Sequence, residues 1–165
     1  MFFDNKNELE ESGFEGFETI HSLISSKCSH VPRVKGVYFV INQDKSTDFV
    51  KESIGGHFKG RNPSLSINKL KENWVNDALV VYIGKAGGKK SKATLQSRLK
   101  QYMRFGEGYP VGHWGGRLIW QLANPKDLII CYKTLENIEP REEEKTLIKD
   151  FESHYGKLPF ANLSH

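Results

Sequence analysis

The sequence has little cysteine and no long apolar run, and both shortages exclude whole classes of protein. Only Cys28 and Cys131 occur in 165 residues, so cysteine can build neither a disulfide framework nor a four-ligand zinc site. No stretch approaches membrane-spanning length, and the acidic start MFFDNKNELEE lacks the basic, then apolar, pattern of a secretory signal. We therefore expect a protein of the reducing cytoplasm with no membrane partner.

Length and charge favour one domain with a local basic region. A chain of 165 residues that is 38% hydrophobic and 12% aromatic has room for one core, so we expect a single domain over residues 1–165. The formal net charge is only +4, but residues 85–106 contain no Asp or Glu. The cations of that segment are Lys85, Lys89, Lys90, Lys92, Arg98, Lys100 and Arg104. Such a concentration is typical of a surface that meets a phosphate backbone.

Hydrophobic patterns predict an α+β fold with a small, mainly antiparallel sheet of three strands flanked by helices. The strands are expected at residues 34–42, 78–84 and 127–135, which are rich in apolar and β-branched residues. Helices are expected at 15–26, at 94–105 and from Pro140 onward, where apolar residues recur at helical spacing.

Two further segments flank or interrupt this core. Residues 1–33 are expected to form an N-terminal helical extension. Residues 42–77 are rich in glycine and polar residues, with a short helix within 67–75, and are interpreted as an insertion loop.

A carboxylate lies on the apolar stripe of the last predicted helix. Glu144 precedes Leu147, Ile148 and Phe151 by three, four and seven residues, which places all four on one helical face. Burying an ionised carboxylate costs several kcal/mol unless a cation or metal compensates it. The plainer alternative is a slightly rolled helix that leaves Glu144 in water.

Arg98 and Tyr102 form a second pair, one turn apart on the basic helix. An arginine fork suits a phosphate whose charge grows during attack, and a tyrosine hydroxyl can position a phosphate oxygen or a water. The alternative is an ordinary solvated cation beside a core tyrosine.

Taken in order, these segments resemble the motifs of the GIY-YIG nucleases. GVY at 36–38 and YIG at 82–84 are similar to the two name-giving strands. The later motifs are represented by YIGKA with Lys85, SRLKQY with Arg98 and Tyr102, EKTLIK with Glu144, and PFAN ending at Asn162. The resemblance spans residues 34–162 and extends to the N-terminal incision domain of the bacterial excision-repair nuclease and to compact restriction-type members.

The resemblance implies a metal-dependent endonuclease that hydrolyses phosphodiester bonds in DNA, in repair or restriction. Glu144 would bind one Mg²⁺ or Mn²⁺, with water and phosphate oxygens completing the coordination sphere. Tyr82 would act as general base, directly or through the metal-bound shell, once nearby cations lower its pKa, and Lys85, Arg98 and the metal would supply that field.

The remaining family positions would have supporting roles. Tyr38 would orient the water or phosphate, and Arg98 would also stabilise the transition state. Tyr102 is a further catalytic candidate through its hydroxyl. Asn162 would hold the last segment against the site. The segment between Tyr38 and Tyr82 is longer than the hairpin usual in the family, and residues are added before Arg98.

Two glycine-rich segments are candidate DNA contacts in addition to the lysines and arginines of residues 85–106. GGHFKGR at 55–61 contributes His57, Lys59 and Arg61, and GHWGGR at 112–117 contributes His113, Trp114 and Arg117. The alternative is that both are loops whose aromatic residues pin them to the core. The expected partner is DNA, double-stranded or branched, and a homodimer is another way to provide target recognition.

Two other functions stay open at the level of sequence. One is a DNA-binding or assembly module that keeps the fold without cutting. The other is a structural RNA-associated protein, which rests only on the basic segment.

Overall fold

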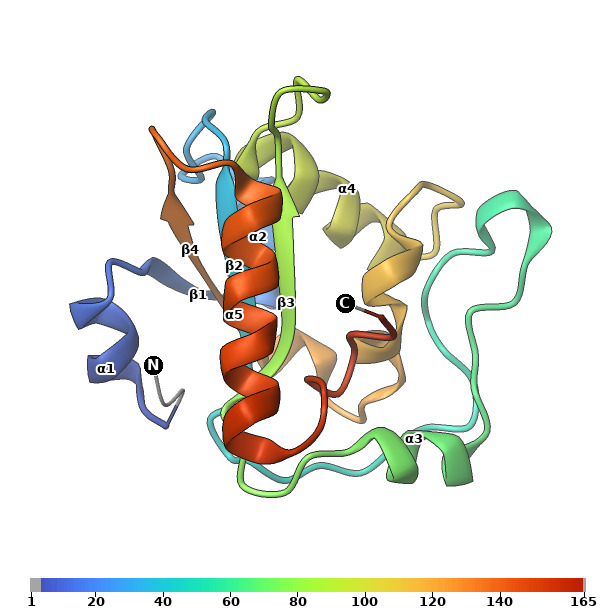
Figure 1. Cartoon of the computed structure of the whole chain (residues 1–165). Helices are drawn as coiled ribbons and strands as arrows, with labels where there is room; N and C mark the ends of the chain where they lie inside the picture. The colour runs from blue at the N-terminus through green and yellow to red at the C-terminus, as the bar shows by residue number, and fades with distance from the viewer. Residues whose placement is uncertain (1–3, 165) are drawn as a thin grey trace.

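A sheet of four antiparallel strands, in the order β1-β4-β2-β3, organises the computed structural model, which describes residues 4–164 (Figure 1). The strands are β1 (Glu15–Thr19), β2 (Gly36–Ile41), β3 (Val80–Ala86) and β4 (Ile129–Thr134). Strand β2 pairs along its whole length with β3 on one side and β4 on the other. The expected α+β class with an antiparallel sheet is confirmed, whereas the expected number of three strands is wrong because β1 adds a fourth.

Residues 15–26 do not form the single helix that their apolar spacing predicted. They form strand β1 and then helix α2 (Ile20–Ser26). Gly16 and Phe17 have φ angles of +98° and +46°, which a right-handed helix does not allow. Helix α2 starts only after Thr19, whose side-chain oxygen accepts a hydrogen bond of 3.1 Å from the Ser22 amide. The N-terminal region is therefore partly sheet.

Helices cover both faces of the sheet. Helix α5 (Pro140–Tyr155) and the short α1 (Lys6–Glu11) pack against the face that carries Val37 and Phe39. Helix α2, helix α4 (Leu95–Gly106) and the 3₁₀ helix η2 (Trp114–Gln121) pack on the opposite face, with Tyr38 and Val40. Figure 1 shows α5 crossing one face along β2 and β3, with α4 behind the sheet. No helix within residues 4–164 combines the length and the apolar character needed to cross a membrane.

The segment between β2 and β3, expected as an insertion loop, is attached to the body by backbone hydrogen bonds and by one buried side-chain amide. It contains the 3₁₀ turn η1 (Phe58–Gly60) and helix α3 (Ile67–Asn73). The side chain of Gln121 is fully buried, and its Nε2 donates to the carbonyl oxygens of Val50 and Leu65 at 3.2 and 2.8 Å. Its Oε1 accepts a hydrogen bond of 2.8 Å from the Leu65 amide. Together with the short antiparallel bridge between Phe49 and Leu122, these bonds hold the segment against the body.

Candidate active site

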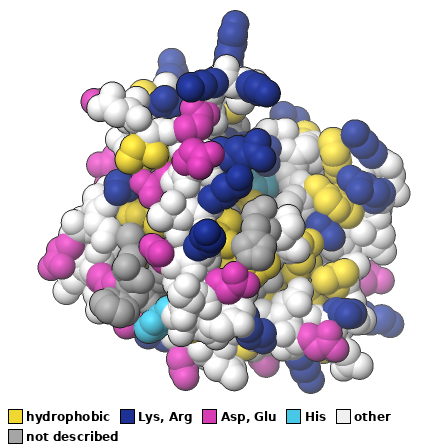
Figure 2. All heavy atoms as spheres, viewed as in Figure 1, with side chains coloured by type: hydrophobic (Ala, Val, Ile, Leu, Met, Phe, Trp, Pro, Cys, Tyr) yellow, Lys and Arg dark blue, Asp and Glu magenta, His cyan; other side chains and the backbone are white. Residues whose placement is uncertain are grey.

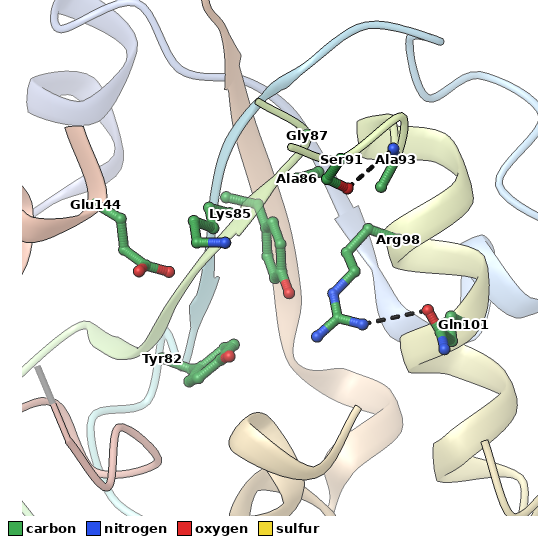
Figure 3. A pocket seen from close by; sticks show the side chains of 10 residues that line it. Tyr82, Lys85, Ala86, Gly87, Ser91, Ala93, Arg98, Gln101 and Glu144 are labelled. Atoms are coloured by element: carbon green, nitrogen blue, oxygen red, sulfur yellow. Dashed lines mark hydrogen bonds between the residues drawn. The ribbon is translucent and has the colours of Figure 1, made fainter. Parts of the chain in front are cut away.

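A pocket of about 430 Å³ lies where the edge strand β3 meets α4 and α5. It is lined by Tyr38, Tyr82, Lys85, Ala86, Gly87, Ser91, Ala93, Arg98, Gln101 and Glu144. Figure 3 shows Glu144 reaching in from α5, Tyr82 and Lys85 coming from β3, and Arg98 entering from α4 on the opposite side. The fold therefore brings together five of the side chains that the sequence singled out as catalytic.

The Glu144 carboxylate is partly buried in this pocket with its oxygens uncommitted. Within the described part of the chain, no hydrogen bond or ion pair holds these oxygens. Burial raises the pKa of Glu144, while the charges of Lys85, Arg98 and Arg141 pull it down. The Glu144 carboxylate thus faces Lys85 and Arg98 across the pocket without bonding to either. A cation or a water can lie between the carboxylate and these two side chains.

Arg98 is held in place through one of its three guanidinium nitrogens. Its Nη1 donates to the Gly112 carbonyl oxygen at 2.8 Å. The same nitrogen donates to Gln101 Oε1 at 3.2 Å (Figure 3). Both bonds use Nη1, so Nε and Nη2 can meet a phosphate on the pocket side. Gln101 was not singled out from the sequence, although its position three residues after Arg98 on the predicted helix was a usable signal.

Tyr82 and Tyr38 form the floor of the pocket. Their ring centroids are 6.1 Å apart, and the Tyr38 hydroxyl lies 2.6 Å from Nε2 of His113. Burial and then the charge of Glu144 raise the pKa of Tyr82 to about 12, and the opposing effect of Arg98 does not compensate them. Arg98 therefore acts in the expected direction, but the side-chain charges alone do not bring the pKa of Tyr82 below its ordinary value. At neutral pH Tyr82 is a protonated phenol.

Tyr102 and His113 are buried, as the plainer alternatives for their segments had it. Tyr102 is fully buried behind the pocket, where its hydroxyl donates a hydrogen bond of 2.6 Å to the Gly116 carbonyl oxygen. His113 was expected to contact DNA, but it is also fully buried and stacks on Tyr102 with a centroid distance of 3.6 Å. Tyr102 is therefore a support rather than a group on the pocket wall, and His113 is not a DNA contact.

Asn162 pairs with the backbone of β3. Its Oδ1 accepts a hydrogen bond from the Ile83 amide, and its Nδ2 donates to the Ile83 carbonyl oxygen, both at 2.9 Å. The Ala161 amide donates to Val81 at 2.8 Å. The C-terminal segment thus takes the place of a fifth strand along β3, and Asn162 supports the strand that carries Tyr82 without lining the pocket.

The basic residues of 85–106 divide between two sides of the molecule. Lys89, Lys90 and Lys92 are exposed on the loop after β3, beside the pocket residues Gly87 and Ser91. Lys100 and Arg104, by contrast, line a separate hollow with Cys28 on another side of α4. Lys100 and Arg104 therefore lie away from the pocket, and their contact with DNA stays a prediction.

The two glycine-rich segments meet at an arginine–tryptophan cluster. The guanidinium carbons of Arg61 and Arg117 both lie 4.4 Å from the ring centroid of Trp114. Burial and the neighbouring charge of Arg61 lower the pKa of Arg117. His57 and Lys59 are exposed on the same insertion. The cluster brings residues 61 and 117, far apart in sequence, onto one surface.

Comparison of the chain with protein-family models, curated proteins and solved structures finds no match. Among residues 4–164, no group of three or more His, Cys, Asp or Glu side chains is arranged to hold a metal ion. The site is therefore interpreted from its own geometry.

Proposed function

We propose that this protein is a metal-dependent endonuclease of the GIY-YIG type that hydrolyses phosphodiester bonds in DNA. The observation that carries the proposal is the uncommitted Glu144 carboxylate in one pocket with Lys85 and Arg98. Lys85 and Arg98 alone would form a binding site for any phosphate group. A carboxylate that faces the same space repels phosphate unless a cation lies between them, so simple phosphate binding does not account for it.

The donor set of the pocket fits Mg²⁺ or Mn²⁺. These hard cations take oxygen ligands, and Mg²⁺ is commonly bound through one or two carboxylates together with water and substrate phosphate. Glu144 is the residue that would hold the ion. When bound, the ion would act as a Lewis acid on the phosphate and would offset the carboxylate charge that raises the pKa of Tyr82.

The remaining side chains supply orientation, charge and proton transfer. Arg98, anchored at Gly112 and Gln101, presents its free guanidinium edge to the phosphate and stabilises the charge that develops in the transition state. Lys85 adds a second positive charge from β3. Tyr82 is the pocket hydroxyl that can take a proton from the attacking water, and Tyr38 lies directly behind it.

The exposed cations around the pocket provide the surface for a nucleic-acid backbone. Figure 2 shows Lys and Arg side chains projecting from the upper edge of the molecule, where Figure 1 places the loop between β3 and α4. Lys89, Lys90 and Lys92 belong to that loop. The arginine–tryptophan cluster combines charge for phosphate with an aromatic face for a base.

Divalent-dependent nicking of supercoiled plasmid tests the proposal. Wild-type protein should convert supercoiled DNA to nicked or linear DNA with Mg²⁺ or Mn²⁺, and EDTA should stop the reaction. The products should carry a 5′-phosphate and a 3′-hydroxyl. DNA binding without cleavage under all divalent conditions would instead favour the non-cutting binding module. Cleavage of RNA alone would overturn the assignment of DNA as substrate.

A further inference from the structure

Arg61 and Arg117 place two positive charges against one aromatic ring. Their guanidinium carbons each lie 4.4 Å from the ring centroid of Trp114, so the two carbons are no more than twice that distance apart. Within residues 4–164, neither guanidinium forms an ion pair with a carboxylate. Arginine does not lose its proton in a protein, so both charges persist and repel each other. An anion bound between them would remove this repulsion.

The ring and one of the two arginines are anchored in the fold. Trp114 packs edge-on against the fully buried ring of Phe105, with a centroid distance of 6.4 Å. Arg117 donates from Nη1 to the Trp114 carbonyl oxygen at 3.0 Å, and in the described part of the chain its Nε and Nη2 have no acceptor. Arg61 is exposed and reaches the ring from the insertion. Guanidinium groups with unused N–H donors suit a phosphate, whose oxygens accept two parallel hydrogen bonds from one arginine.

Gly115 lies between this cluster and the catalytic pocket. It follows Trp114 directly and is exposed, and a Cβ atom at its position would lie 3.7 Å from the Tyr82 hydroxyl oxygen. That distance is an ordinary van der Waals contact, and the φ angle of Gly115 is not in the left-handed region, so neither a clash nor backbone strain requires glycine here. The absent side chain leaves the surface between Tyr82 and Trp114 open to a strand of nucleic acid.

We propose that Arg61 and Arg117 together bind a second phosphate of the DNA strand that is cut, and that this strand passes over Gly115 to the catalytic pocket. The inference rests on the proposed nuclease function, to which it adds a subsite. Binding the strand at two points fixes the position of the phosphate that is cleaved. The two arginines act as a unit, because a phosphate that bridges both is lost when either side chain is removed.

Salt titrations of the binding of a short DNA duplex in EDTA test the shared phosphate without any cleavage. Arg61→Gln and Arg117→Gln each remove one charge, and glutamine at 117 can still donate to the Trp114 carbonyl oxygen. Each variant should lower the slope of log K against log salt by about 1, the value for one phosphate, and the double variant should lose no more than that. Lys149→Gln, which removes an exposed cation on α5, is the matched control and should leave the slope unchanged.

Three results of these titrations would overturn the proposal. A loss of about 2 in the double variant would show two separate phosphate contacts, and wild-type slopes would show none. The third is a site for free phosphate: inorganic phosphate would raise the melting temperature of the wild type but not of Arg61→Gln, while the DNA slopes stayed equal. If Arg117→Gln does not fold, the slope of Arg61→Gln against that of the Lys149 control decides the question.

Substitution of Gly115 tests the path of the strand. Gly115→Leu places a bulky side chain over the Tyr82 hydroxyl and should weaken DNA binding in EDTA roughly tenfold or more, because a strand that cannot reach both sites loses the gain from binding at two points. Gly115→Ala adds only an ordinary contact and should bind nearly as the wild type does. The melting temperatures of both variants should stay near the wild-type value. Wild-type affinity of Gly115→Leu would show that the strand takes another route.

The outcomes separate this inference from the nuclease proposal. If the wild-type protein cuts no DNA under any divalent condition, the nuclease proposal fails, but the slopes measured in EDTA still show whether the two arginines share a phosphate. If the wild type cuts DNA and the slopes of the arginine variants equal that of the Lys149 control, the subsite alone is overturned.

Discussion

The ring of Tyr38 lies directly over Gly84, its cross-strand partner on β3. A Cβ atom at Gly84 would come within 2.5 Å of the Tyr38 hydroxyl oxygen, so any other residue there would push the ring away. Because Gly84 of the YIG motif has no side chain, the ring of Tyr38 from the GVY motif can lie against it. This contact between the two motifs places the Tyr38 hydroxyl behind Tyr82, where the pocket has its proposed base.

We predict that Tyr82→Phe is far more damaging than Tyr38→Phe. The first removes the group that exchanges a proton with water, which should lower kcat about a hundredfold or more. The second removes one supporting hydrogen bond and should lower it about tenfold. Steady-state kinetics of the two variants, with melting temperatures as a control for folding, check the order. Equal and small effects would mean that a tyrosine base is not used.

The pH dependence of kcat/KM of the wild-type protein should also identify Tyr82 as the base. The pKa of Tyr82 is raised to about 12 without metal, so below that value the fraction of phenolate grows about tenfold for each pH unit. Therefore kcat/KM should rise with pH through the neutral and mildly alkaline range, and the rise should end at a lower pH when more divalent cation is bound. Tyr82→Phe should flatten the profile.

We predict that Arg98→Lys is not a conservative change. Lysine provides a point charge but cannot hold Gly112 and Gln101 while it also presents a planar edge to phosphate. We expect kcat to fall roughly a hundredfold, the scale of losing one transition-state donor. Arg33→Lys, a change on an exposed side chain outside the pocket, is the matched control. Wild-type turnover of the Arg98 variant would reduce this residue to a binding role.

The sequence predicted the pocket best where helical spacing determines which face a residue occupies. Glu144 was found because the stripe of Leu147, Ile148 and Phe151 fixes its direction, and Arg98 was found in the same way. Spacing alone did not separate Arg98 from Tyr102, because both lie on one face and only the packing of Gly116 and His113 draws the tyrosine inward.

The missed features depend on contacts between distant parts of the chain. His113 lies in a glycine-rich segment that is held by the hydrogen bond from Arg98 to Gly112 and by the contact between His113 and Tyr38. No local sequence pattern predicts these contacts. Strand β1 was read as helix because Phe17 and Ile20 have helical spacing. The positive φ angle of Phe17 and the pairing with β4 arise only in the folded sheet.

We predict that Lys59→Ala combined with Arg61→Ala weakens DNA binding without changing stability. Both side chains are exposed, and Arg61 stacks on Trp114 rather than entering the core. Loss of two phosphate contacts should lower the salt dependence, the slope of log K against log salt, by about 2. Binding titrations at several salt concentrations measure this.

The matched control for this pair removes two exposed cations elsewhere, by Lys126→Ala with Lys149→Ala. The control gives the same change in net charge and should leave the slope near the wild-type value. Equal slopes for the two double variants would show that the insertion does not contact DNA and would direct attention to Trp114 and Arg117.

We predict that Asn162→Ala lowers the free energy of unfolding by about 2 kcal/mol. The substitution removes both hydrogen bonds to Ile83 and leaves the two backbone groups of a buried residue without partners. Urea denaturation measures the change. Asn124→Ala is the control, because Asn124 is exposed and its side chain forms no cap on the helix that follows. Equal stability of both variants would exclude the proposed support of β3.

The most direct measurement of the central claim compares Glu144→Gln with Glu142→Gln in the plasmid assay and in Mn²⁺ titrations. Glu142 is an exposed glutamate two residues earlier on α5, so its substitution removes the same charge outside the pocket. The account predicts that Glu144→Gln abolishes cleavage and Mn²⁺ binding while DNA binding is retained, because a negative charge near phosphate is also removed. Glu142→Gln should behave as wild type. Cleavage by Glu144→Gln at a rate comparable to wild type would contradict the assignment of this pocket as a metal-dependent phosphodiesterase site.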